Sequence, residues 1–263
     1  MVAIDLDGTL LTDAKQVSEH TVKALCGLPQ RQVKVVIASA RPPRAVRHIY
    51  QLLKLDTLQV NYNGALIWDE PGRRAAYHRP MDGALVLRVI EHARDFYEEV
   101  LVSCEILDRW YTDRFEDKYV TETGRLFKPD VIAPLPNFCV RPITKLLLLG
   151  EKVMIDRLEK VLTETYGGQI SVVRTDPELL QLMDHGASKA DALTRVAQFY
   201  GLDMKEVMAI GDAPNDVEML QAAGVAIAMD NAHRLVKKAA HWVAPSNNDH
   251  GVHAALMKYG LCD

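Results

Sequence analysis

The order of apolar runs and helical segments limits the fold of this chain more than any other feature. Strand-like runs alternate with segments of helical periodicity up to about residue 69, in the order 1–6, 18–28, 33–39, 42–55 and 58–68. The same alternation returns after residue 186. Continuously apolar strands joined by helices imply a parallel sheet that is covered on both faces. We therefore expect an α/β fold with a doubly wound, Rossmann-like core.

The middle of the chain has a different order of predicted helices and strands. Helical and strand-like segments follow one another there without strict alternation, and a proline-interrupted stretch carries Pro129, Pro134, Pro136 and Pro142. An α+β unit inserted into an α/β core is the economical interpretation. We expect a first core segment at residues 1–79, an inserted α+β cap at residues 80–185 and a second core segment at residues 186–263.

Composition narrows the class of partner. The chain has 263 residues and a formal charge of −4, which argues against nucleic acid or an anionic membrane as the main partner and favours a small molecule. No apolar run approaches the roughly 18 residues of a membrane helix, and two acidic residues within the first seven positions do not fit a signal peptide. We expect a cytoplasmic protein. Four cysteines without a CxxC pair predict neither a disulfide framework nor a zinc site, and the oligomeric state stays open.

Polar residues follow the predicted strands where each strand ends. Asp5 and Asp7 end the first strand, Ser39 to Arg41 end the second, and Asp212 ends a strand of the returning block. Ligands of open α/β sheets bind beyond the carboxyl ends of the strands, so these residues should face one crevice. Side chains two positions apart along a strand point to the same side, which brings the two carboxylates of Asp5 and Asp7 together.

Neighbouring carboxylates at a strand end are stable when a divalent cation lies between them. Mg²⁺ takes hard oxygen ligands and commonly binds one or two carboxylates together with a substrate phosphate, so Asp5 and Asp212 are candidate ligands. An aspartate can also act as a nucleophile that forms an aspartyl-phosphate. Asp7 could then donate a proton to the leaving alcohol, a role that needs a raised pKa in Asp7 while Asp5 remains ionised.

The remaining parts of such a site should donate hydrogen bonds or positive charge to phosphate oxygens. Ser39 offers a hydroxyl, Ala40 a backbone amide, and Lys189 a cation at the start of a helix. Each of them alone is also compatible with turn chemistry or a solvated surface. Their combination in one chain with DxDGT favours the functional interpretation.

The chain resembles the haloacid dehalogenase-like superfamily, specifically its Cof-type sugar phosphatases with a large α/β cap. The motifs that carry the resemblance appear in order, and they are DLDGT at 5–9, SAR at 39–41, Lys189 in GASKADAL, GDAPND at 211–216, NGA at 63–65 and APSNNDHGV at 244–252. The departures are mild, with Ser39 in place of the commoner threonine and His250 where an acid is usual. No catalytic group is missing.

The resemblance implies a role for each matching residue. Asp5 would be the nucleophile and an Mg²⁺ ligand, and Asp7 would be the acid/base and a metal ligand through its carbonyl. Asp212 would be the second metal carboxylate, and Asp216 would orient the metal shell or Lys189. The phosphate would be held by the side chains of Ser39, Lys189 and Asn215 and by the backbone amides of Leu6 and Ala40.

The sequence thus predicts an Mg²⁺-dependent phosphatase for small phosphorylated metabolites, with sugar phosphates implied by the resemblance alone. A phosphomutase or phosphotransferase would keep the same motifs, and a non-enzymatic aspartate phosphoacceptor would use the same carboxylates. Two surface features are given no site role: His250 and His253 are expected to be solvated rather than zinc ligands, and Arg44 and Arg47 are expected on a solvated helix face.

Overall fold

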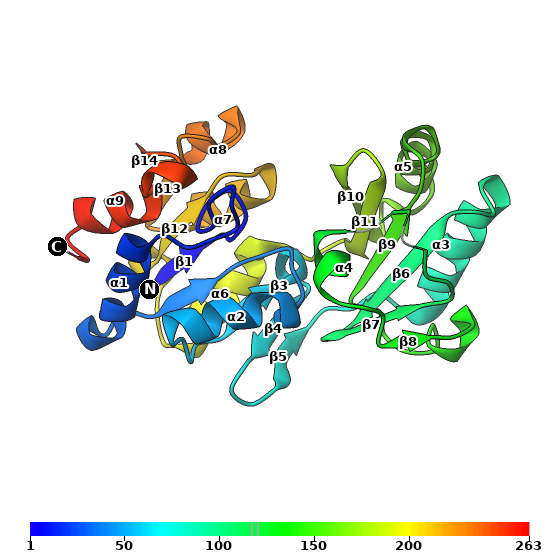
Figure 1. Cartoon of the computed structure of the whole chain (residues 1–263), viewed down its shortest axis with the longest axis horizontal. Coiled ribbons are helices and arrows are strands. Elements are labelled where there is room, and N and C mark those ends of the chain that lie inside the picture. Colours follow the sequence, from blue (N-terminus) through cyan, green and yellow to red (C-terminus); the bar gives the residue numbers. More distant parts are fainter. Residues whose placement is uncertain (117, 120, 263) are drawn as a thin grey trace. The chain divides into compact units, whose positions relative to one another are not determined.

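The structure is a computed structural model, and it describes residues 1–116, 118–119 and 121–262. The chain divides into two compact units, which we call the core unit (residues 1–77 and 188–263) and the inserted unit (residues 78–187). Figure 1 shows that the core unit is built from both ends of the chain. Among the described residues, no helix combines the length and the apolar character needed to span a membrane.

A five-stranded parallel sheet forms the centre of the core unit. Its strand order is β14-β13-β12-β1-β2, and the strands are β1 (Val2–Ile4), β2 (Val35–Ile37), β12 (Met208–Gly211), β13 (Val225–Met229) and β14 (Trp242–Ala244). The chain winds outward from β1 to β2, and in the opposite direction from β12 to β14. The point where the winding reverses therefore lies between β1 and β12, which is where open α/β sheets place their ligands. The predicted α/β class with a doubly wound parallel core is confirmed.

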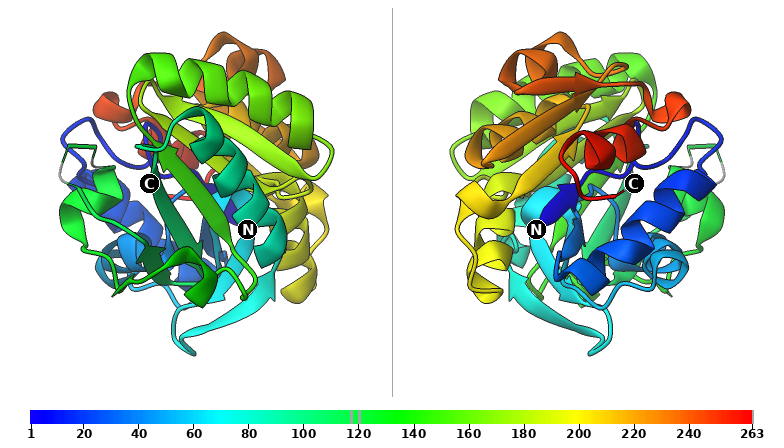
Figure 2. Two further views of the ribbon diagram at one scale, coloured as in Figure 1. Left: turned by 90° about the vertical axis from the view of Figure 1, so that its right-hand side faces the viewer. Right: turned by 90° about the vertical axis from the view of Figure 1, so that its left-hand side faces the viewer.

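The helices of the core unit fall into two groups according to their contacts. One group is α1 (Glu19–Gly27), α2 (Pro43–Leu53) and α9 (Gly251–Lys258), and the other is α6 (Lys189–Phe199), α7 (Val217–Ala222) and α8 (Arg234–Ala239). Helix α1 contacts α2 and α9, whereas α7 contacts α6 and α8. Figure 2 shows α9 (red) beside α1 (blue). Right-handed crossovers that run in opposite directions place their helices on opposite faces of a sheet, so both faces are covered and the strands can be apolar throughout.

Helix α2 corrects one expectation from the sequence. Its apolar stripe consists of Val46, Ile49 and Leu53, and Leu52 is 47% exposed because it lies about 100° around the helix from Leu53. Arg44 is buried, although we expected it on a solvated face. All four residues of the first turn, 43–46, are buried, so this turn has no solvated side.

The predicted third strand is a hairpin instead of one interrupted strand. Strand β3 (Gln59–Asn61) pairs antiparallel with β4 (Leu66–Asp69), and β5 (Arg74–His78) completes a three-stranded sheet. The turn at residues 62–64 has positive φ angles at all three positions. Left-handed residues reverse the chain direction, which explains why the two halves pair with each other. A parallel bridge between Ala38 and Val60 attaches the hairpin beside β2.

The inserted unit is built around a six-stranded sheet of order β10-β11-β9-β6-β7-β8. All of its strand pairs are antiparallel except that of β7 with β8. Helices α3 and α5 bury their apolar faces against one side of the sheet. The elements are β6 (Leu101–Ile106), β7 (Arg109–Thr112), β8 (Val131–Ile132), β9 (Lys145–Leu149), β10 (Ile170–Asp176), β11 (Leu179–Asp184), α3 (Gly83–Phe96), α4 (Glu122–Leu126) and α5 (Lys152–Tyr166).

Candidate active site

The ends of β1 and β12 bring three carboxylates together. Asp5 follows β1, and its backbone N–H donates to Ile210 of β12. Asp212 follows β12, and Asp216 lies in the short helical turn after it. Carboxylate oxygens of Asp5, Asp212 and Asp216 lie within 4.8 Å of one another, and this is the one such group of potential metal ligands in the described residues. We call these three residues the Asp5 cluster.

Lys189 holds two members of the Asp5 cluster. It is the first residue of α6, its side chain is 1% exposed, and its Nζ donates to Asp5 Oδ1 at 2.5 Å and to Asp216 Oδ1 at 2.7 Å. The other oxygen of Asp216 accepts from the backbone N–H groups of Asp212 (3.1 Å) and Ala213 (3.0 Å). Both oxygens of Asp216 are therefore already engaged within the protein, and Asp216 anchors Lys189 and the loop that carries Asp212.

Burial sets the ionisation of this cluster. It raises the pKa of Asp5 well above its usual range, against the attraction of Lys189, and the charges of Asp216 and Asp212 raise it further. Burial also raises the pKa of Asp212, although the Thr9 hydroxyl donates to its Oδ1 at 2.7 Å. The pKa of Lys189 is lowered by burial, but Asp216 and Asp5 outweigh this and raise it overall, so the lysine stays charged. One buried cation thus faces three carboxylates.

The donor set fits a hard divalent cation. Both oxygens of Asp216 already accept hydrogen bonds, so Asp5 and Asp212 are the better candidates to turn an oxygen toward a metal ion, and Mg²⁺ commonly uses one or two carboxylates. Gly8 leaves room at this place, because a Cβ atom there would lie 2.4 Å from Asp212 Oδ2. Gly8 also has a φ of 83°, a conformation that favours glycine and turns the chain sharply after Asp7.

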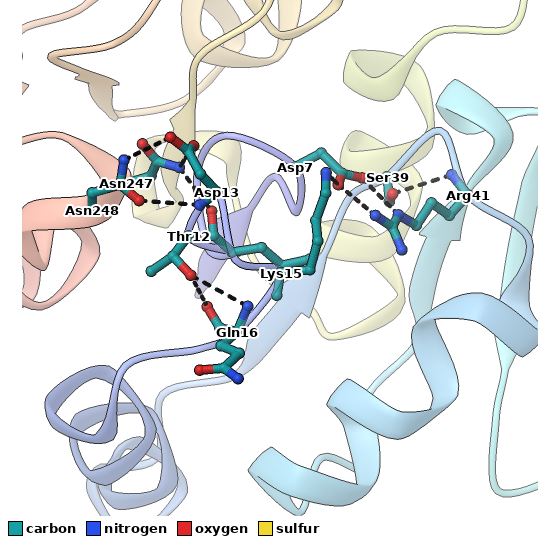
Figure 3. Close-up of polar contacts among 10 residues, drawn as sticks. Asp7, Thr12, Asp13, Lys15, Gln16, Ser39, Arg41, Asn247 and Asn248 are labelled. Carbon is teal, nitrogen blue, oxygen red and sulfur yellow. Dashed lines mark hydrogen bonds and ion pairs between the residues drawn. The ribbon is translucent and has the colours of Figure 1, made fainter. Parts of the chain in front are cut away.

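Asp7 lies outside the Asp5 cluster and has its own partners. Arg41 Nε donates to Asp7 Oδ2 at 2.6 Å, and Lys15 Nζ donates to Asp7 Oδ1 at 2.9 Å, as Figure 3 shows. Arg41 Nη2 also donates to Oδ1 at 2.5 Å, which makes the arginine contact bidentate. Strand β1 ends at Ile4, so the alternation of side chains along a strand does not extend to Asp7.

These contacts reverse the expected direction of the pKa shift. Burial opposes ionisation of Asp7, but the hydrogen bonds and charges of Arg41 and Lys15 outweigh it and hold the pKa of Asp7 below its usual range. The proposed acid role of Asp7 called for a raised pKa in that residue. The raised pKa belongs instead to Asp5, which is the more deeply buried carboxyl and has two acidic neighbours.

The predicted phosphate-binding residues lie around the same strand ends. Ser39 follows β2, is 1% exposed, and accepts the Arg41 backbone N–H with its Oγ at 3.1 Å. Leu6 is buried directly after Asp5, and Ala40 is half-buried. Asn215 is exposed on the turn after β12, and its Nδ2 donates to Asn63 Oδ1 at 2.9 Å.

Several contributing residues were not singled out from the sequence. Thr9 fixes Asp212, and Asn231 Nδ2 donates to the Gly8 carbonyl at 2.8 Å. The APSNNDHGV signature supports the loop after Asp7, since Asn247 and Asn248 both donate to the carboxylate of Asp13 (Figure 3). That loop carries Lys15. Its anchors lie some 235 positions away in the chain, so only the folded structure identifies them.

Residues 2–256 match the family described as haloacid dehalogenase-like hydrolase. The chain belongs to the haloacid dehalogenase-like hydrolases. It is 28% identical to a 5-amino-6-(5-phospho-D-ribitylamino)uracil phosphatase of Bacillus subtilis over 98% of this chain and 97% of the relative. A solved haloacid dehalogenase-like hydrolase from Bacteroides thetaiotaomicron has a TM-score of 0.88 at 27% identity and covers 98% of each chain.

A second solved structure agrees in fold alone. It is a sugar phosphatase of subclass IIB of this superfamily, with a TM-score of 0.81 at 18% identity over 99% of this chain and 98% of that one. The family and enzyme class predicted from the motifs, a phosphatase of the haloacid dehalogenase-like superfamily, are confirmed.

Proposed function

We propose that this hydrolase is an Mg²⁺-dependent phosphomonoesterase that works through an aspartyl-phosphate on Asp5. Its substrates would be small phosphorylated metabolites, with sugar phosphates as the first class to test. The observation that carries the proposal is the Asp5 carboxylate, buried at the switch point of the sheet, held by Lys189 and adjacent to Asp212. The relatives support the substrate class, since one is named for a phosphorylated ribityl compound.

In the first step, a carboxylate oxygen of Asp5 attacks phosphorus and the bond from phosphorus to the leaving oxygen breaks. Lys189 keeps Asp5 in place, and its positive charge would stabilise the phosphate oxygens that gain negative charge. Ser39, Asn215 and the backbone amides of Leu6 and Ala40 are the proposed further donors. To act as an acid, Asp7 must first give up its contacts with Arg41 and Lys15 and take up a proton from solvent, which it then passes to the leaving oxygen.

In the second step, water attacks phosphorus, the bond between phosphorus and Asp5 breaks, and inorganic phosphate leaves. Asp7 takes the proton from the attacking water. Arg41 and Lys15 hold Asp7 in its ionised form, which is the form that accepts a proton. The arrangement seen here therefore supports the base role of Asp7 directly.

Asp5 and Asp212 would hold Mg²⁺, with the Asp7 carbonyl as a further ligand proposed from the family resemblance. The cation would supply neutralising charge, which lets a phosphate approach an acidic site. Asp216 keeps its proposed role of orienting Lys189 and the Asp212 loop, for which its hydrogen bonds to both are suited.

The test is phosphate release from a panel of sugar phosphates, nucleotides and an aryl phosphate, in Mg²⁺ or in EDTA. We expect turnover that needs Mg²⁺. It should fall more than about a thousandfold in Asp5→Asn, as it does when other enzymes lose a covalent nucleophile. Asp56→Asn is the matched control, since Asp56 is an exposed aspartate outside the proposed site, and it should retain turnover.

Two outcomes would contradict the proposal. Turnover that persists in Asp5→Asn would exclude Asp5 as the nucleophile. No turnover on any substrate, together with stoichiometric labelling of Asp5 by a small phosphodonor, would instead favour a phosphotransferase or a phosphoacceptor.

A further inference from the structure

The turn at residues 62–64, which we call the NG turn, touches three of the segments that carry proposed phosphate-binding residues. The backbone N–H of Asn63 donates to the Ser39 carbonyl at 3.1 Å. The side-chain Oδ1 of Asn63 accepts from Asn215 Nδ2 at 2.9 Å. Gly64 packs against the backbone before Lys189, where a Cβ atom would lie 2.0 Å from the Ser188 carbonyl oxygen. The turn therefore joins the segments of Ser39, Lys189 and Asn215.

The backbone of the NG turn is held in a conformation that costs free energy. Tyr62 and Asn63 are not glycines, yet their φ angles are 49° and 53°. Such residues cost about 1–3 kcal/mol each where the geometry is unfavourable, and they gather at functional sites. Asn tolerates this region better than a bulky residue such as tyrosine. Tyr62 is fully buried, so the surrounding structure maintains the turn in spite of this cost.

Asn215 needs an orienting partner. It is exposed, and it lies on a helical turn of only three residues, which gives its side chain little local support. A primary amide presents two N–H donors at one end and an acceptor oxygen at the other. Asn63 Oδ1 engages one N–H of Asn215, which fixes the nitrogen end of that amide and leaves its second N–H to donate elsewhere. A reversed amide would present oxygen to an anionic phosphate instead.

We propose that Asn63 is a positioning residue, which orients the Asn215 amide so that it donates to the substrate phosphate. The inference rests on the proposed function and deepens it, because it assigns a task to a side chain that the catalytic steps do not use. Asn63 acts through Asn215, so its effect should be seen in phosphate binding and should depend on Asn215.

The test uses Asn63→Gly, which removes the acceptor and keeps a backbone that favours positive φ. The readouts are the dissociation constant of inorganic phosphate in the presence of Mg²⁺ and, where a substrate is turned over, kcat/KM. We expect a three- to tenfold loss in each, the effect of one neutral hydrogen bond. Asn137→Gly, at an exposed position of the inserted unit, is the control and should change neither.

A double-mutant cycle separates positioning from a general structural role. In the Asn215→Ala background, adding Asn63→Gly should change phosphate affinity by less than about twofold, because the coupled partner is already gone. Equal losses in both backgrounds would overturn the inference, and so would an unchanged Asn63→Gly protein when Asn215→Ala is impaired. A wild-type protein that neither binds phosphate nor releases it would overturn the proposed function itself, which is a different result.

Discussion

Asp5 and Asp7 are two residues apart, yet they lie in opposite electrostatic settings. Asp5 is buried among Asp212, Asp216 and Lys189, and burial raises its pKa. Asp7 is 37% exposed at its side chain and lies between Arg41 and Lys15, which lower its pKa. The comparison shows that spacing along the chain does not decide ionisation. The partners decide it, and all of them except Lys15 come from distant segments of the chain.

The largest expected loss of stability follows removal of Lys189, the cation of the Asp5 region. Lys189→Met leaves Asp5 and Asp216 buried without their shared partner, and breaking a buried ion pair costs about 3–5 kcal/mol of unfolding free energy. Urea denaturation measures this loss. Lys237→Met is the matched control in the core unit: its ion pair with Asp230 is largely exposed, so it should cost less than about 1 kcal/mol. A comparable loss of unfolding free energy in both variants would contradict the expectation that the buried Lys189 pairs matter more than an exposed ion pair.

The second-largest expected effect is stabilisation by Mg²⁺, which should depend on the carboxylates of the Asp5 region. Binding at a hundredfold excess over Kd stabilises the folded state by about 2.7 kcal/mol, which raises the melting temperature by roughly 5–10 °C for a protein of this size. Asp212→Asn should abolish this rise. Without a divalent cation the same variant should melt at or above the wild-type temperature, because it removes one of the crowded carboxylates. Calorimetry in Mg²⁺ and in EDTA checks both statements. A full Mg²⁺ shift in Asp212→Asn would count against Asp212 as a ligand.

Arg41→Met tests the Asp7 region, and its effect on unfolding free energy should depend on pH. The contact is partly exposed, so we expect a loss of about 1 kcal/mol in unfolding free energy at pH 7. Because the pKa of Asp7 is depressed in the folded state, this stabilisation is present above its unfolded pKa of about 3.9 and disappears as the pH falls through the folded value. Urea denaturation at pH 7, 5 and 3 should show the gap between wild type and variant narrowing only at pH 3.

The control for Arg41→Met is Arg47→Met, on the helix α2 that follows Arg41, because the partner of Arg47 is Glu70 rather than Asp7. An NMR titration should show the pKa of Asp7 rising in the first variant and unchanged in the second. A stability gap that grows as the pH falls would contradict the assignment of the lowered pKa to Arg41.

Lys15→Ala should have the smallest effect. The Lys15 side chain is 49% exposed, so its ion pair with Asp7 is screened by water and contributes less than about 1 kcal/mol. Any difference in unfolding free energy should vanish at 1 M salt, where the Debye length is only about 3 Å. If the loss exceeded that of Arg41→Met, Lys15 would be the main partner of Asp7.

Much of the fold could be predicted because each element follows a local rule. The alternation of strands and helices specified the parallel core, and Ser18 and Ser188 cap α1 and α6 where the sequence places a serine before an apolar-periodic segment. The hairpin of β3 and β4 was missed: Asn63-Gly64 is a dipeptide that favours a reversal, but the turn also needs a positive φ at Tyr62, which that residue type does not demand. Arg44 was also misplaced, because all four residues of the first turn of α2 are buried, which the helical period alone does not indicate.

The sequence by itself determined the family, the α/β core, and the polar residues at the strand ends, because those depend on motif order and local periodicity. The motifs also predicted that Asp5, Asp212 and Lys189 share a site. Only the tertiary structure decided that Asp7 lies apart from them, paired with Arg41 and Lys15, and that Asn63 contacts Asn215. Charge interactions depend on distance and burial, and both are set by segments that lie up to about two hundred positions apart in the chain.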